Sequence, residues 1–261
     1  MKQAGSLAHS IPNPNTPRDS ESQISRATLG LREMLLRGEF RPGQRISEIP
    51  LSAKLGVSRT PLRLAFERLE HEGLIKALPN SGFAAGEFTL NDIWDAIEAR
   101  GILEGAAARI AAERLNNPVQ LEPLRKINRA MRAIATLNLD SFIQYLDLNE
   151  AFHLAILDLA NNKLLRRAID QIYKFPFSVP NSRALLPMSL RAAKELIPIA
   201  EEHHKALIDA IEHREGSRAE GIGREHALVT RRNMERALDD PNFLETIPGA
   251  RLIKFRSANH A

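Results

Sequence analysis

The chain of 261 residues contains no cysteine. No disulfide can therefore brace the fold, and no thiolate can bind a metal ion. The sequence also lacks any apolar run approaching the length of a membrane span, and its N-terminus lacks the apolar core of a secretory signal peptide. We therefore expect a cytoplasmic protein with no membrane segment.

What is present is typical of a soluble globular protein. Hydrophobic residues make up 43% and charged residues 26% of the chain, and the length suits two domains. The net charge of +4 is unevenly distributed, because basic residues outnumber acidic ones between Gln23 and Glu87 but nearly balance them from Thr89 to Asp240. A small basic domain joined to a larger neutral one suggests that the basic domain binds nucleic acid.

One stretch combines an apolar stripe with basic residues. A helix is predicted from Ser58, which can act as its N-cap, with Pro61 in the first turn, where a missing N–H costs nothing. Its apolar positions recur at helical spacing: Leu62, Ala65, Phe66 and Leu69. Arg59 and Arg63 are four residues apart and share a face, with Thr60 beside it. This pattern is typical of a DNA recognition helix, although two surface arginines on an ordinary amphipathic helix would also produce it.

The flanking sequence has the order of a winged helix-turn-helix. A first helix is predicted from Ile24 to Gly38, and a second from Ser47 to Leu55. The three-residue turn 56–58 joins the second helix to the arginine helix. Two short apolar runs, 74–78 and 83–88, flank a polar tip and predict a β-hairpin wing.

This arrangement closely resembles the winged-helix domain of GntR-family bacterial transcription regulators. The resemblance covers about residues 23–88. It rests on these strings: Pro42-Gly43, Leu55-Gly56-Val57-Ser58-Arg59-Thr60-Pro61-Leu62-Arg63, Arg68-Leu69-Glu70, Glu72-Gly73-Leu74, and Asn80 with Gly82. It implies that the recognition-helix residues Ser58, Arg59, Thr60 and Arg63 lie at double-stranded operator DNA, and that Gly82 lets the wing approach the minor groove. Many relatives carry a basic residue about where Ile49 stands, so the sequence departs from the family there.

From Thr89 onward the pattern is almost purely helical. Helices are predicted over the ranges 90–115, 121–137, 141–159, 164–173, 192–212 and 217–238, with an irregular proline-bearing stretch at 176–187. The predicted organisation is therefore a disordered leader (1–22), a winged-helix domain (23–88), an all-α bundle (89–240) and a tail (241–261). We expect the tail to be irregular and its basic residues to be merely solubilising.

Three histidines in the predicted bundle each interrupt an apolar helix face. His153 shares its face with Asn149, while His204 and His226 lie on the stripes of two later helices. A single histidine of this kind is more often a hydrogen-bonded core residue, but three from separate helices suit a zinc or nickel ion. His203 is next to His204 but points about 100° away on a helix.

The same segments resemble the FCD ligand-binding domain of the FadR branch of the GntR family. The strings that carry the resemblance are Asn149-Glu150-Ala151-Phe152-His153, Ala160-Asn161, the run from His204 to Ile211, and His226. The resemblance implies that Asn149, His153, His204 and His226 bind the metal ion. Arg100 lies in a string whose arginine often reaches the effector, although a helix-surface salt bridge to Glu104 would explain Arg100 equally well.

These observations lead to a homodimeric transcription regulator, not an enzyme, controlled by a small carboxylate effector. All four predicted metal ligands are neutral, so the charge of the cation would call for an anionic group. One alternative is a metalloenzyme, which would need Asp147 or Glu150 as general base, and both of these neighbour the Asn149–His153 face without sharing it. The other is a metal-free DNA-binding protein whose histidines are structural.

Overall fold

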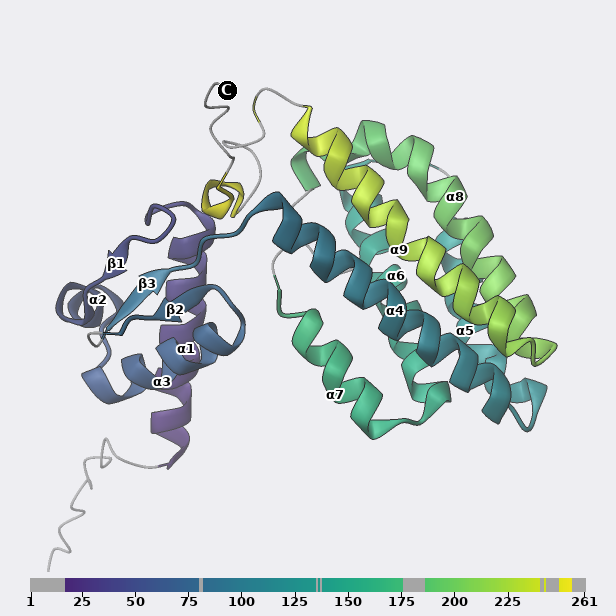
Figure 1. The fold of residues 1–261 in the computed structure, drawn as a ribbon, viewed down its shortest axis with the longest axis horizontal. Helices are drawn as coiled ribbons and strands as arrows, with labels where there is room; N and C mark the ends of the chain where they lie inside the picture. The colour runs from purple at the N-terminus through teal and green to yellow at the C-terminus, as the bar shows by residue number, and fades with distance from the viewer. Residues whose placement is uncertain are drawn as a thin grey trace, which may run out of the picture.

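The computed structural model describes residues 17–79, 82–134, 136, 138–175, 186–239, 242 and 249–254, and the account below concerns these residues. The described chain is mainly helical, with one small three-stranded sheet near the N-terminus, which confirms the predicted fold class. Figure 1 shows a small helix-and-sheet unit beside a larger helical bundle, and the long helix α4 begins where the two meet.

The smaller unit is a helix-turn-helix with an adjoining sheet. Its elements are α1 (Pro17–Leu36), β1 (Arg45–Ile46), α2 (Glu48–Leu55), α3 (Arg59–His71), β2 (Ile75–Ala77) and β3 (Phe83–Ala85). The three strands are antiparallel in the order β1-β3-β2. The predicted wing is present as β2 and β3, whereas β1 was not predicted, because two residues carry no alternation that a sequence could reveal.

The turn into α3 follows from its residue types. Gly56 ends α2 in the left-handed conformation, with φ +62°, which glycine adopts at little cost. Ser58 is the N-cap of α3 as expected, but its hydroxyl makes no capping hydrogen bond. The apolar stripe of α3 is buried, and Phe66 packs on Phe83 of the wing with ring centroids 4.7 Å apart.

The expectation of a disordered leader over 1–22 is wrong for its last six residues, because α1 begins at Pro17. Proline suits the first turn of a helix, and Glu21 on α1 forms an ion pair with Arg68 on α3 at 2.8 Å. Residues 1–16 lie outside the described residues.

The larger unit is a helical bundle. Its elements are α4 (Leu90–Arg114), η1 (Pro118–Leu121), α5 (Glu122–Arg132), α6 (Leu139–Ala160), α7 (Lys163–Ile172), α8 (Leu186–Glu212) and α9 (Gly216–Leu238). Thr89 and Asp92 form a reciprocal capping box that starts α4 at the predicted place. Helix α8 starts six residues before the predicted position, and Pro198 lies inside it. The predicted irregular stretch 176–187 lies mostly outside the described residues.

Helices α4 and α9 pack with their backbones in close contact. A Cβ atom added at Gly101 would lie 2.8 Å from the Cβ of Ala227, and one added at Gly105 would lie 2.7 Å from the carbonyl oxygen of Glu220. Gly223 on α9 faces Gly105 in the same way, with 2.9 Å to its Cα. These small residues therefore allow α4 and α9 to approach closely, and both helices contribute to the site described below.

The C-terminal segment is not merely irregular and solubilising, which corrects the expectation for 241–261. Residues 249–254 lie against the smaller unit, where the yellow turn η3 (Ala250–Leu252) sits beside α1 in Figure 1. Leu252 is fully buried in the same apolar cluster as the helix-turn-helix core. Lys254 forms an ion pair with Glu87 at 2.8 Å. Arg256 and the rest of the tail lie outside the described residues.

A separate apolar cluster fills the junction between the two units. It joins the start of α4, the end of α9 and the C-terminal segment, and its buried members are Ile93, Ile97, Ala227, Met234, Ala250 and Ile253. Phe175, just after α7, packs edge-on against Phe88 with ring centroids 5.1 Å apart. The junction is thus a packed contact and not only a flexible linker.

None of the described helices is long and apolar enough to cross a lipid bilayer.

Candidate functional site

The predicted DNA-contacting residues of α3 lie together on one exposed surface. Ser58, Arg59, Thr60 and Arg63 are all exposed at the N-terminal half of α3, while the buried stripe of this helix faces the core. Gly82 has φ +96°, a conformation that favours glycine, at the start of the wing strand β3. The residues predicted from the sequence are therefore available to a ligand at this surface.

Two charged neighbours of this surface were not predicted. Glu48 at the start of α2 pairs with Arg63, with both carboxylate oxygens 3.2 Å from Nε. Arg45 on β1 lies beside the wing, because a Cβ added at Gly82 would meet its Nη2 at 3.4 Å. Both contacts join residues far apart in the sequence, so local patterns could not indicate them. The Arg63 side chain is 65% exposed, and an exposed ion pair of this kind contributes at most about 1 kcal/mol, so DNA could displace Glu48.

The second site lies inside the bundle, where the three predicted histidines converge. His153 comes from α6, His204 from α8 and His226 from α9, and each exposes 6% or less of its surface. One ring nitrogen from each lies within 4.8 Å of the others. Asn149 is buried one helical turn before His153 on α6. The structure thus brings together the three histidines that the sequence placed on separate helices.

Four of the six ring nitrogens of this histidine cluster have no hydrogen-bond partner among the residues that the structure describes. The unpartnered atoms include Nε2 of His153, both ring nitrogens of His204 and Nδ1 of His226. Burial lowers the pKa of His153, partly opposed by the Glu104 carboxylate, and lowers the pKa values of His204 and His226 well below 6.5. Neutral buried imidazoles without partners are suited to bind a cation through their lone pairs.

The donor set fits a divalent metal ion. Ring nitrogens 2.0–2.1 Å from a tetrahedral zinc ion are roughly 3.4 Å apart, so the three rings would need only to move slightly inward. Three imidazoles with one further ligand also suit nickel. The predicted alternative of hydrogen-bonded core histidines requires partners for the ring nitrogens, and those just named have none among the described residues.

The salt-bridge interpretation placed Arg100 on the helix surface, but Arg100 is buried. It is 1% exposed, and its Nη2 donates to the carbonyl oxygen of Ala227 at 3.3 Å and to the hydroxyl of Thr230 at 2.8 Å, both on α9. Its Nε lies 3.8 Å from Glu104, while Nε and Nη1 have no hydrogen-bond partner in the part of the chain that the structure describes. A buried guanidinium with two unpartnered donor nitrogens can hold an anion.

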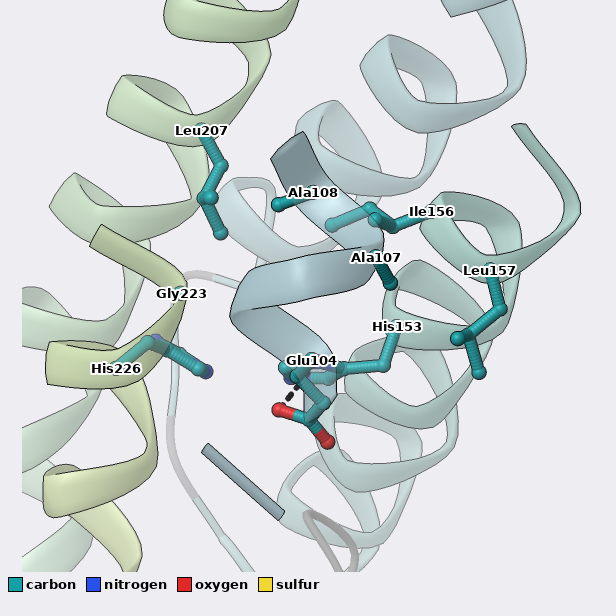
Figure 2. Close-up of a pocket in the computed structure, with 9 residues that line it drawn as sticks. All are labelled: Glu104, Ala107, Ala108, His153, Ile156, Leu157, Leu207, Gly223 and His226. Carbon is teal, nitrogen blue, oxygen red and sulfur yellow. Dashed lines mark ion pairs between the residues drawn. The ribbon is translucent and has the colours of Figure 1, made fainter. Parts of the chain in front are cut away.

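Sequence reasoning missed Glu104 and Tyr173 as members of this site. Glu104 on α4 is 6% exposed, and its Oε2 lies 3.4 Å from Nδ1 of His153, as the dashed line in Figure 2 marks. Tyr173 donates its hydroxyl to Oε1 of Glu104 at 2.7 Å. Glu104 adds one negative charge, which the charge argument from the sequence left out, and Arg100 offsets it. One usable signal was the spacing of Arg100 and Glu104, which puts both side chains on one face of α4.

The general bases required by the metalloenzyme alternative do not line this site. Asp147 and Glu150 are both exposed on α6, whereas Asn149 and His153 are buried. His203 was set aside because of its direction, yet its ring centroid lies 5.7 Å from that of His226. It nevertheless falls outside the set of three mutually close histidines.

The cavity between these helices is small. It is lined by Glu104, Ala107 and Ala108 of α4, His153, Ile156 and Leu157 of α6, Leu207 of α8, and Gly223 and His226 of α9 (Figure 2). Its volume is about 10 Å³, enough for roughly one water molecule or ion. A small organic acid could enter only if the lining helices moved apart.

Comparisons with known proteins match both units of the chain. Residues 23–84 match the family model of bacterial regulatory proteins of the gntR family, and residues 95–228 match the FCD domain model. The chain is 34% identical over 139 residues to the Nta operon transcriptional regulator of Aminobacter aminovorans, covering 53% of this chain and 64% of that protein. It is 32% identical over 135 residues to an uncharacterised HTH-type transcriptional regulator from the ttuE-ttuC' intergenic region of Agrobacterium vitis, covering 51% and 78% respectively.

Among solved structures, the chain is similar to Lar, described as controlling expression of the Listeria monocytogenes agr system. The TM-score is 0.58 at 22% identity, covering 81% of this chain and 96% of Lar, and this similarity concerns the fold alone. The match to the Aminobacter protein spans less than two thirds of that relative. Both sequence relatives are named as transcriptional regulators.

Proposed function

Because this chain belongs to the gntR family of bacterial regulatory proteins and carries an FCD domain, we propose that it is a DNA-binding transcription regulator. Its α3 surface and wing bind operator DNA, and its helical domain binds a divalent cation together with a small carboxylate effector. The effector changes the affinity of the protein for its operator, and the protein catalyses no reaction.

The DNA part rests on the exposed arginines of α3. Arg59 and Arg63 lie at the end of α3 where backbone N–H groups are unsatisfied, so side chains and helix terminus together favour phosphate and guanine. Thr60 and Ser58 lie beside them, and the wing at Gly82 approaches the DNA backbone. Arg45, next to Gly82, adds a phosphate contact that the family string did not suggest.

The single observation that carries the regulatory part is the buried cluster of His153, His204 and His226. Together with Asn149 these side chains hold a zinc or nickel ion. When bound, the cation supplies a positive charge that attracts an anionic ligand. The charges of Arg100 and Glu104 offset each other, so a site that holds the cation keeps a net positive charge, which favours an anionic effector. The unpartnered nitrogens of Arg100 provide a second anchor for its carboxylate.

The small cavity explains how binding could alter DNA affinity. Because about 10 Å³ cannot hold an organic acid, the effector must displace α4, α6, α8 or α9. Helices α4 and α9 also form the apolar cluster at the junction with the DNA-binding domain. An effector that binds one arrangement of the junction better than another shifts the population of arrangements and so the DNA affinity.

We further propose that the protein acts as a homodimer. A single recognition helix contacts only a few base pairs, which is too little for specificity in a genome, whereas two related by a twofold axis read an inverted repeat.

The DNA part is tested with an operator selected from a random duplex library. Arg63→Ala should weaken binding to the selected operator by about 1–3 kcal/mol for each half-site, the usual value of a bidentate arginine–guanine contact. Arg129→Ala is the matched control, since that arginine is equally exposed but lies on α5. Equal operator affinity of the two variants would overturn the assignment of α3.

A further inference from the structure

Glu104 is a buried carboxylate with an unusual set of neighbours. It lies outside the set of three histidines that could hold a cation. Its Oε1 accepts a hydrogen bond of 2.7 Å from Tyr173. Its Oε2 has no hydrogen-bond partner among the described residues and faces Nδ1 of His153 at 3.4 Å. Burying a carboxylate is costly unless it is paired, so a role for its position is to be expected.

A simple ion pair with Arg100 does not account for this position. The Arg100 guanidinium makes its short contact with Thr230 at 2.8 Å, and its Nε is 3.8 Å from Glu104. Glu104 instead makes its shortest contact with Tyr173, and its other oxygen faces the ring of a proposed metal ligand. The Glu104 carboxylate is therefore placed to interact with His153 as much as with Arg100.

Building on the metal site proposed above, we propose that Glu104 and Tyr173 are positioning residues for His153. The Glu104 carboxylate, 3.4 Å from Nδ1 of His153, attracts an N–H at that nitrogen and so favours the tautomer whose Nε2 carries the free lone pair. Tyr173 holds the carboxylate in place through its hydroxyl. Nε2 of His153 has no hydrogen-bond partner, as this role requires. Metal-binding histidines commonly donate their other N–H to a carboxylate, which sets ring orientation and raises basicity.

The chemistry of the three groups supports the direction of the Tyr173–Glu104 hydrogen bond and the orientation of His153. Burial, together with the adjacent Glu104 carboxylate, raises the pKa of Tyr173, so its hydroxyl keeps its proton and donates it. A carboxylate has no proton to donate, so it favours an N–H at the facing Nδ1 of His153. The chain Tyr173–Glu104–His153 thus has one consistent assignment of protons.

The test titrates metal-stripped full-length protein with zinc alone, in competition with a chelating dye. Glu104→Gln should weaken zinc binding by about 10–100-fold, the usual effect of losing such a partner, and Tyr173→Phe should weaken it by a smaller factor. Tyr145→Phe is the matched control, because Tyr145 is the only other tyrosine in the sequence, is buried, and has a hydroxyl without a hydrogen-bond partner among the described residues. It should bind zinc as the wild type does.

A second measurement separates positioning from general support of the fold. Nitrogen NMR of the metal-free wild type should show His153 protonated at Nδ1, and Glu104→Gln should raise the share of the Nε2-protonated tautomer. Tyr173→Phe serves the same purpose if Glu104→Gln fails to fold. If wild-type protein binds zinc and both variants bind it equally tightly, this inference is wrong. If wild-type protein takes up no zinc, the proposed metal site fails, and the inference with it.

Discussion

Replacing Leu252 by alanine tests whether the C-terminal segment is part of the DNA-binding domain. Leu252 is fully buried in the apolar cluster formed by α1, α2, α3 and the wing, although it follows the helices of the larger unit in the sequence. Its backbone carbonyl accepts a hydrogen bond from Phe88 at 3.0 Å, and Gly249 donates to the carbonyl of Leu36 at 2.7 Å. The segment therefore contributes both a core side chain and backbone pairing.

Truncating a buried leucine to alanine typically costs about 2–5 kcal/mol. We expect a value near the lower end, about 2–3 kcal/mol, because a short segment held by few contacts can shift and so limit the loss. Three backbone hydrogen bonds hold the segment to Leu36 and Phe88, each with a net value of about 0.5–1.5 kcal/mol. The substitution leaves these bonds in place, so we expect the segment 249–254 to stay attached to the smaller unit.

The assay is urea unfolding followed by circular dichroism, with Leu29→Ala as the matched control. Leu29 lies on α1 of the same domain but is 62% exposed, so the same chemical change there should alter stability by no more than about 0.5 kcal/mol. A destabilisation of Leu252→Ala no larger than that of Leu29→Ala would refute the packing described here. The same variant should also reduce the proposed change in operator affinity on effector binding, since the segment packs against α4 and α9 at the junction.

Two further predictions concern titration and assembly. In metal-stripped protein, the lowered pKa values of His204 and His226 mean that the unfolded state binds more protons below pH 6.5. The free energy of unfolding should therefore fall as the pH decreases, by up to about 1.4 kcal/mol per pH unit for each imidazole. Urea unfolding at pH 7.0 and 5.5 should show a smaller loss of stability for His204→Ala than for the wild type. Analytical ultracentrifugation should detect a dimer at micromolar concentration, and a monomer both with and without operator DNA would contradict the proposed assembly.

Periodicity explains why much of this molecule could be predicted from its sequence. The stripe Leu62, Ala65, Phe66 and Leu69 indicated both the extent and the buried face of α3. The same reasoning placed His153, His204 and His226 on inward faces, where they are indeed buried. Long helices with one apolar face reveal their orientation locally, since burial repeats with the helical period.

Contacts between distant segments could not be predicted in this way. Tyr173 meets Glu104 across 69 positions, and nothing in either local pattern indicates the other. The segment 249–254 has no periodicity because a single turn and one bridge residue are too short to show any. Its role as part of the DNA-binding domain core depends on the tertiary fold, which brings the chain end back to α1 and Phe88.

The central claim is that a metal ion in the histidine cluster makes the protein responsive to a small carboxylate. The most direct measurement is the operator affinity of zinc-loaded wild type and of His204→Ala across a panel of small organic acids. We predict that at least one acid changes the operator affinity of the wild type, whereas His204→Ala takes up no zinc, still binds the operator, and no longer responds. If His204→Ala lacks zinc but responds to the same acid at the same concentration as the wild type, the metal is not the sensor and the claim is wrong.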